Sequence, residues 1–167
     1  WVINISNVQT DEENESGLIG AVNATVILRE TNNLHLRAAT SQLNVKKLIF
    51  EENSIFKSRS RLANGIQPTT LSAIAITNGT ILVKKNAKVS IINDGKSKEK
   101  AGKPVQSSSS AIAGSISNFT MEPDSEVLTE ANIYSYRTTI KNTFTMTGGA
   151  KFEAIGTANS IFVSAEN

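Results

Sequence analysis

Carboxylate side chains are the first residues of this sequence that could do chemistry. Glycoside hydrolysis needs two positioned carboxylates, and calcium-assisted lyases need an acidic cluster together with a base. The acidic candidates are three aspartates and two local glutamate pairs: Asp11, Asp94, Asp124, Glu51 with Glu52, and Glu122 with Glu126. Asp11 and Asp94 fall in polar, loop-like stretches, Asp124 falls at a predicted turn, and the glutamates fall at turn or outward positions. We therefore predict that the protein is not an enzyme and has no catalytic residues.

Histidine and tyrosine supply the remaining candidates. His35, the only histidine, alternates outward between Leu34 and Leu36 and has no acidic or cysteine partner nearby in the sequence, so we expect a surface residue. Tyr134 and Tyr136 are two residues apart and would share one face of a strand. They are the best candidates for contact with a small ligand, and simple edge packing is the alternative. The sequence holds no phosphate loop, zinc spacing or nucleophile elbow, so we predict no cofactor and no metal.

Composition narrows the possible partners. The 167 residues are 39% hydrophobic, which suffices for one domain, and the net charge of +2 without a charged block favours neither nucleic acid nor a membrane surface. Cysteine is absent, and no run approaches the roughly 20 apolar residues of a membrane span. Because the chain begins at Trp1 without a signal segment, we expect a fragment of a larger protein. We predict a single domain over 1–167, with an N-terminal capping strand and turn at 1–17 and a flexible loop insertion at 93–110.

The candidate ligand-binding and catalytic residues must be positioned by the elements of the fold. An eleven-residue frame that recurs along the chain predicts what these elements are. The frame from Ile81 (ILVKKNAKVSI) is repeated from Leu18, Leu48, Phe119 and Phe144. Its first, third and ninth positions are apolar except at Gly20, and its seventh is always Ala or Ser. The sixth position holds residues that readily adopt left-handed backbone, which a sharp corner requires: Asn23, Asn53, Asn86, Asp124 and Gly149.

This frame predicts two short strands joined by a corner. The frames begin at 18, 48, 81, 119 and 144, so they are 30, 33, 38 and 25 residues apart. Unequal spacing of this kind suits a parallel β-helix (a β-solenoid) of about five to six irregular coils, whose corners tolerate insertions. In this arrangement Trp1 would cover one open end. The alternative is a β-sandwich, which would not require the sixth and seventh positions to repeat.

Several stretches resemble the pectate-lyase-like adhesive domain of Gram-positive cell-surface proteins. They are residues 1–8, 17–20, 23–28, 33–36 and 74–91. The resemblance implies a right-handed β-helix that is secreted, displayed on the bacterial cell surface or cell wall, and used for attachment without catalysis. The expected partner is a host or cell-wall glycan, a matrix protein or another surface protein.

Three functions therefore remain open. The first is a non-enzymatic module of a surface protein that acts in adhesion or as a structural stalk. The second is a polysaccharide lyase or hydrolase whose carboxylates converge only in three dimensions, and the third is a phage or fibre component. An acidic groove would favour the enzyme, a threefold interface the fibre, and flat polar faces the adhesin.

Overall fold

Two parallel β-sheets form most of this protein. The computed structural model describes residues 1–10, 19–37, 43–61, 72–93, 99–100, 103–104, 110–131 and 134–156, and these contain strands and turns but no helix. The six-stranded sheet has, in order, β1 (Val2–Ser6), β2 (Ile19–Arg29), β4 (Leu43–Phe50), β6 (Ser72–Val83), β10 (Ser110–Met121) and β12 (Tyr134–Met146). The five-stranded sheet has, in order, β13 (Lys151–Gly156), β11 (Glu126–Ala131), β7 (Lys88–Asn93), β5 (Ile55–Arg61) and β3 (Thr31–Arg37).

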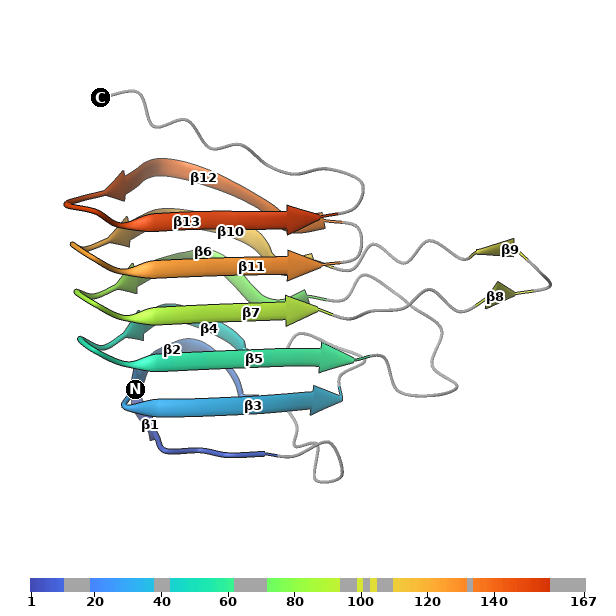
Figure 1. Ribbon diagram of the computed structural model, residues 1–167, viewed down its shortest axis with the longest axis horizontal. Coiled ribbons are helices and arrows are strands. Elements are labelled where there is room, and N and C mark those ends of the chain that lie inside the picture. The colour runs from blue at the N-terminus through green and yellow to red at the C-terminus, as the bar shows by residue number, and fades with distance from the viewer. Residues whose placement is uncertain are drawn as a thin grey trace.

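The chain alternates between the two sheets. We call one strand of the six-stranded sheet, the turn after it and the next strand of the five-stranded sheet a layer. Five layers follow one another along the chain (β2–β3, β4–β5, β6–β7, β10–β11 and β12–β13) and lie stacked in Figure 1. All pairings within the two main sheets are parallel, whereas a β-sandwich is built from antiparallel strands. This pairing argues against the sandwich.

Apolar rows hold the layers in register. Leu48, Ile81 and Phe119 are consecutive Cα partners in the six-stranded sheet and are at most 1% exposed. On the five-stranded sheet Phe56, Val89 and Val127 are paired in the same way and are also buried. Because side chains alternate between the two faces of a strand, the residues directly before and after each of these buried residues point outward. Four of the five predicted frames therefore stack position on position.

The turns between the sheets stack as well. Left-handed backbone is present at the sixth frame position of the second to fifth layers, with φ values of 60°, 57°, 59° and 79° at Asn53, Asn86, Asp124 and Gly149. The small residues that follow the first three of these are buried: Ser54, Ala87 and Ser125. Backbone N–H groups link neighbouring turns, as in Asn86 N–H to Pro123 O at 3.1 Å. Backbone N–H groups of the tight turns are therefore satisfied by carbonyl groups of adjacent layers.

The corner predicted at Asn23 is wrong. Asn23 lies within β2, and the left-handed turn of the first layer is at Glu30, with φ of 55°. Val26, not Leu18, pairs with Leu48, so the true frame starts eight residues later. Apolar residues occur along the whole of β2, and the turn after it is shorter than the others. Both features let the sequence frame fit in the wrong place.

A buried asparagine completes that shorter turn. Asn32 is 1% exposed and pairs with Phe56, where the other layers carry an apolar residue. Its side-chain oxygen accepts a hydrogen bond from Val8 N–H at 3.1 Å, and its amide donates one to Arg29 O at 2.8 Å. Both ends of the amide are therefore satisfied, which makes its burial tolerable.

The N-terminal segment forms a strand, but Trp1 does not cover the end of the stack. β1 pairs with β2, and Ile3 and Ile5 pack against the core. Trp1 precedes them at the free start of the strand and is fully exposed. β1 is the edge strand of the six-stranded sheet, and in the described part of the chain no strand lies beyond it against which the indole could pack.

Gly114 permits a close approach between β10 and β6. Its φ of 119° is unfavourable for L side chains, and an added Cβ would lie 2.1 Å from the carbonyl oxygen of Ile76. The neighbouring layers can therefore meet here only if this residue is glycine.

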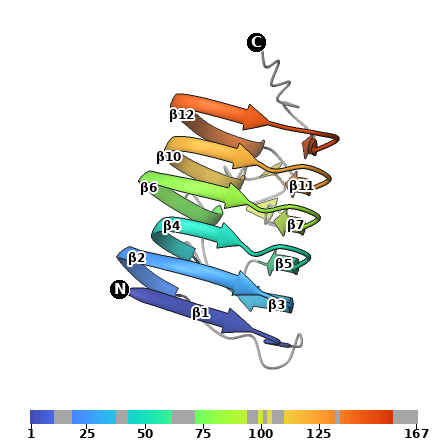
Figure 2. The same ribbon diagram turned by 90° about the vertical axis from the view of Figure 1, so that its left-hand side faces the viewer.

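The predicted insertion at 93–110 lies largely outside the described residues. Within it, β8 (Glu99–Lys100) and β9 (Lys103–Pro104) pair antiparallel and project from the stack (Figure 1). Figure 2 shows the six-stranded sheet along its full height, with β1 at one end and β12 at the other. Among the described residues no helix is long and apolar enough to cross a membrane.

Candidate functional site

The outer face of the five-stranded sheet carries the candidate site. Parallel pairing in register brings outward residues of successive strands into rows that run across the sheet. The first row, from the eighth frame position, is Ile55, Lys88, Glu126 and Lys151. The second row, from the tenth position, is Lys57, Ser90, Leu128 and Glu153.

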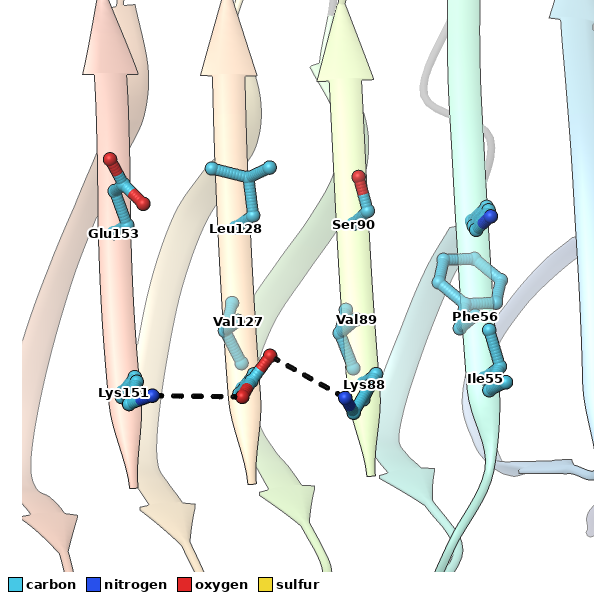
Figure 3. A pocket seen from close by; sticks show the side chains of 11 residues that line it. Ile55, Phe56, Lys88, Val89, Ser90, Val127, Leu128, Lys151 and Glu153 are labelled. Atoms are coloured by element: carbon cyan, nitrogen blue, oxygen red, sulfur yellow. Dashed lines mark ion pairs between the residues drawn. The ribbon is translucent and has the colours of Figure 1, made fainter. Parts of the chain in front are cut away.

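The two rows line a shallow hollow of about 460 Å³. Ser90 has the smallest side chain of the second row and is flanked by Lys57 on β5 and Leu128 on β11. Figure 3 shows Ser90 and Leu128 on neighbouring strands, with Glu153 beyond them. A volume of this size falls within the usual range of small-ligand sites, which are mostly apolar with a few placed polar groups.

Charges in the first row are partly compensated within the row. Glu126 lies between two lysines, with carboxylate oxygens 4.0 Å from Lys88 Nζ and 3.9 Å from Lys151 Nζ (Figure 3). Exposure of the side chains is 45% for Glu126, 62% for Lys88 and 77% for Lys151. Such exposed pairs add little stability, about 0–1 kcal/mol each. Glu126 compensates one of the two lysine charges, so this edge of the hollow stays positive by one charge.

Charges in the second row are separated. Lys57 and Glu153 stand at opposite ends of the row, and both residues are exposed. Neither side chain forms an ion pair within the described part of the chain. They lie on β5 and β13, which are three strand spacings apart, or about 14 Å. The hollow therefore has a positive end and a negative end, with Ser90 and Leu128 between them.

Of the carboxylates considered from the sequence, Asp11 and Asp94 lie outside the described residues, and the others do not form an acidic cluster at this hollow. Glu51 pairs with Lys84 at 2.9 Å, and a carboxylate oxygen of Glu122 accepts a hydrogen bond from Lys85 N–H at 3.0 Å. Asp124 occupies its turn, and Glu126 alone of these lines the hollow. Among the described residues, no group of three or more His, Cys, Asp or Glu could hold a metal ion.

The predicted ligand contact at Tyr134 and Tyr136 stays a prediction. Both residues lie in β12 of the six-stranded sheet, opposite Ser110 and Ile112, and their side chains lie outside the described part of the structure. His35 lies in β3, and its side chain is likewise outside the described part.

Sequence reasoning missed Lys57, Ser90, Leu128 and Glu153. They share the tenth frame position but no residue type, so their repetition gives no chemical signal. Their common frame position was nevertheless visible, and stacking the frames would have placed them in one row.

Comparison with known protein families, with curated protein sequences and with solved structures finds no match.

Proposed function

We propose that this protein is a non-enzymatic module of a bacterial cell-surface protein, acting in adhesion or as a structural stalk. The observation that carries the proposal is that inward and outward positions of the layers differ in how much their residue types vary. Inward positions and turns fix a repeated parallel stack, while outward positions vary in charge and size. Such a scaffold can present variable surfaces along one axis, which is how repeat proteins build extended binding faces.

In this proposal the two sheets are faces of a right-handed parallel β-helix. Consecutive strands alternate between the sheets and return in the same direction, as a continuously winding chain would. Stacked turns with left-handed residues support the same architecture. Connections between parallel strands are right-handed in nearly all proteins, which agrees with the hand implied by the sequence resemblance.

The polar outer surface of the six-stranded sheet also suits attachment. Thr143 donates a hydrogen bond to the Asn118 side chain at 3.0 Å, and Asn78 accepts hydrogen bonds from Ser115 at 3.3 Å and Lys141 at 2.6 Å. Hydroxyl, amide and ammonium groups are therefore held in place on a face that spans several layers. They can bond to a host or cell-wall glycan, to a matrix protein or to another surface protein. The corresponding location is the extracellular face of the cell.

A binding array of glycans and matrix proteins tests this function. We expect saturable binding to at least one ligand class and no product in a parallel lyase assay with polygalacturonate and calcium. Calcium-dependent release of unsaturated products would overturn the proposal in favour of the lyase. Absence of binding to every glycan and matrix protein would overturn the adhesive role.

A further inference from the structure

We propose that the hollow on the five-stranded sheet binds an extended peptide segment with an acidic residue, an apolar residue and a basic residue at positions i, i+2 and i+4. This inference rests on the proposed adhesive function and names the chemical class of its partner. The peptide would lie along the stack, across β5, β7, β11 and β13.

Spacing is the first argument. Lys57 and Glu153 are three strand spacings apart, about 14 Å. An extended peptide rises about 3.3–3.4 Å per residue, so residues i and i+4 are about 13–14 Å apart. Residues i, i+2 and i+4 also point to the same side of an extended chain. The acidic side chain therefore meets Lys57 when the basic side chain meets Glu153.

The floor of the hollow supplies the middle contact. Ser90 leaves space between its larger neighbours, Leu128 is partly exposed, and Ile55 is 38% exposed. A leucine-sized side chain at i+2 can enter this space and bury the exposed methyl groups of Leu128 and Ile55.

The lining favours a peptide over a sugar chain. Carbohydrate sites commonly stack a sugar ring on an exposed aromatic side chain. Among the described residues of the lining, the aromatic one is Phe56, which is 1% exposed and packs inward against Phe50. The hollow instead offers methyl groups, one hydroxyl and charges of both signs, which match the side chains of a mixed-charge peptide.

Charge selectivity comes from the second row. Glu126 is shared by Lys88 and Lys151, so the first row keeps the charge of one lysine, which is exposed and screened by salt. Lys57 and Glu153 have no such partners within the described part of the chain. A ligand with two acids or two bases would meet one like charge, whereas a mixed pair meets two opposite charges.

Three capped pentapeptides with the sequences DALAK, DALAD and KALAK test the proposal. We expect the wild-type protein to bind DALAK about fivefold more tightly than the other two, since two exposed ion pairs replace one. Binding is followed by NMR titration, with the largest amide shifts at Ser90 and Leu128. Because the comparison depends on charge type, it holds whichever way the peptide runs.

Charge-reversal variants make the test specific. Glu153→Lys should switch the preference to DALAD, and Lys57→Glu should switch it to KALAK. Both side chains are exposed, so the dispersed NMR spectrum of the fold should persist. Glu52→Lys is the matched control, because it makes the same charge change at an exposed turn residue outside the hollow and should keep the DALAK preference.

The proposal is overturned if no peptide shifts these amides, if the wild-type protein binds all three equally, or if Glu52→Lys changes the preference as Glu153→Lys does. A glycan that shifts the same amides while the peptides do not would also overturn it. Failure of the peptide test with array binding intact removes only this inference. Unsaturated products from polygalacturonate, with the peptide preference intact, would remove only the non-enzymatic function.

Discussion

Replacement of Asn86 by valine tests the physical basis of the stacked turns. Asn86 has φ of 57°, and its side-chain amide donates a hydrogen bond to Asn53 Oδ1 at 3.0 Å. Left-handed backbone costs a β-branched residue about 1–2 kcal/mol. Loss of the exposed hydrogen bond adds about 0.5–1 kcal/mol. We therefore expect Asn86→Val to lower the free energy of unfolding by about 1.5–3 kcal/mol.

Glycine at the same position separates the two contributions. Asn86→Gly also removes the side-chain hydrogen bond, but it adopts left-handed backbone without steric cost. It should cost about 0.5–1.5 kcal/mol, which includes the greater freedom of the unfolded chain. The difference between the valine and glycine variants, about 1–2 kcal/mol, then measures the backbone requirement.

Urea unfolding followed by circular dichroism provides the measurement, and Asn23→Val provides the control. Asn23 is exposed, lies at the irregularity between Ala21 and Thr25 of β2, and does not have left-handed backbone, so this change should stay within about 0.5 kcal/mol of wild type. The reasoning is refuted if Asn86→Val and Asn86→Gly are equally stable. It is also refuted if Asn23→Val costs as much as Asn86→Val, since an equal cost would indicate that Asn23 occupies a left-handed turn as well.

Two further substitutions probe the packing between layers by the same urea measurement. Gly114→Ala combines unfavourable backbone at φ of 119° with a Cβ placed 2.1 Å from Ile76 O, so we expect a loss of about 3–5 kcal/mol. A loss under about 1 kcal/mol would mean that β6 and β10 relax apart. Phe119→Ala should cost about 3–5 kcal/mol because its ring is 1% exposed and contacts Phe144 and Phe152 at centroid distances of 5.1 and 5.9 Å. Phe144→Ala, at a half-buried position, should cost about half as much, and equal losses would contradict the difference in burial between the two rings.

Much of the stack was predictable because its requirements are visible as residue types. A buried row needs an apolar residue in every layer, and a left-handed turn needs Asn, Asp or Gly. Leu48, Ile81 and Phe119 satisfy the first requirement, and Asn53 and Asn86 satisfy the second. Both requirements repeat at fixed spacing, so an alignment of the chain with itself detects them.

The first layer escaped prediction because its chemistry differs. Its turn places Glu30, not Asn or Gly, at φ of 55°, and its row on the five-stranded sheet contains Asn32. Asn32 is satisfied by Arg29 of the same turn and by Val8 of the N-terminal segment. No local sequence pattern predicts an asparagine at this buried position, since it depends on a contact with the N-terminal segment.

The hollow could not be recognised from residue types for a different reason. Lys57, Ser90, Leu128 and Glu153 are far apart in the sequence and share only their frame position. Local pairs such as Glu51 with Glu52 are easily identified as candidate sites because they are adjacent in the chain. Adjacent residues of a strand point to opposite faces, however, whereas residues one layer apart lie side by side.

The same register that fixes the core also fixes this surface. Val89 and Val127 pair inside the stack, and Ser90 and Leu128, one residue further, pair outside it. A slip of one residue between layers would expose the buried row and would also separate the residues that line the hollow. Selection for a buried core therefore also preserves the geometry of this surface. Outward side chains remain free to change, because exposed substitutions usually alter stability by less than about 0.5 kcal/mol. The opposite charges of Lys57 and Glu153 therefore cost the fold little stability. The two strands between them set the distance that matches residues i and i+4 of an extended peptide.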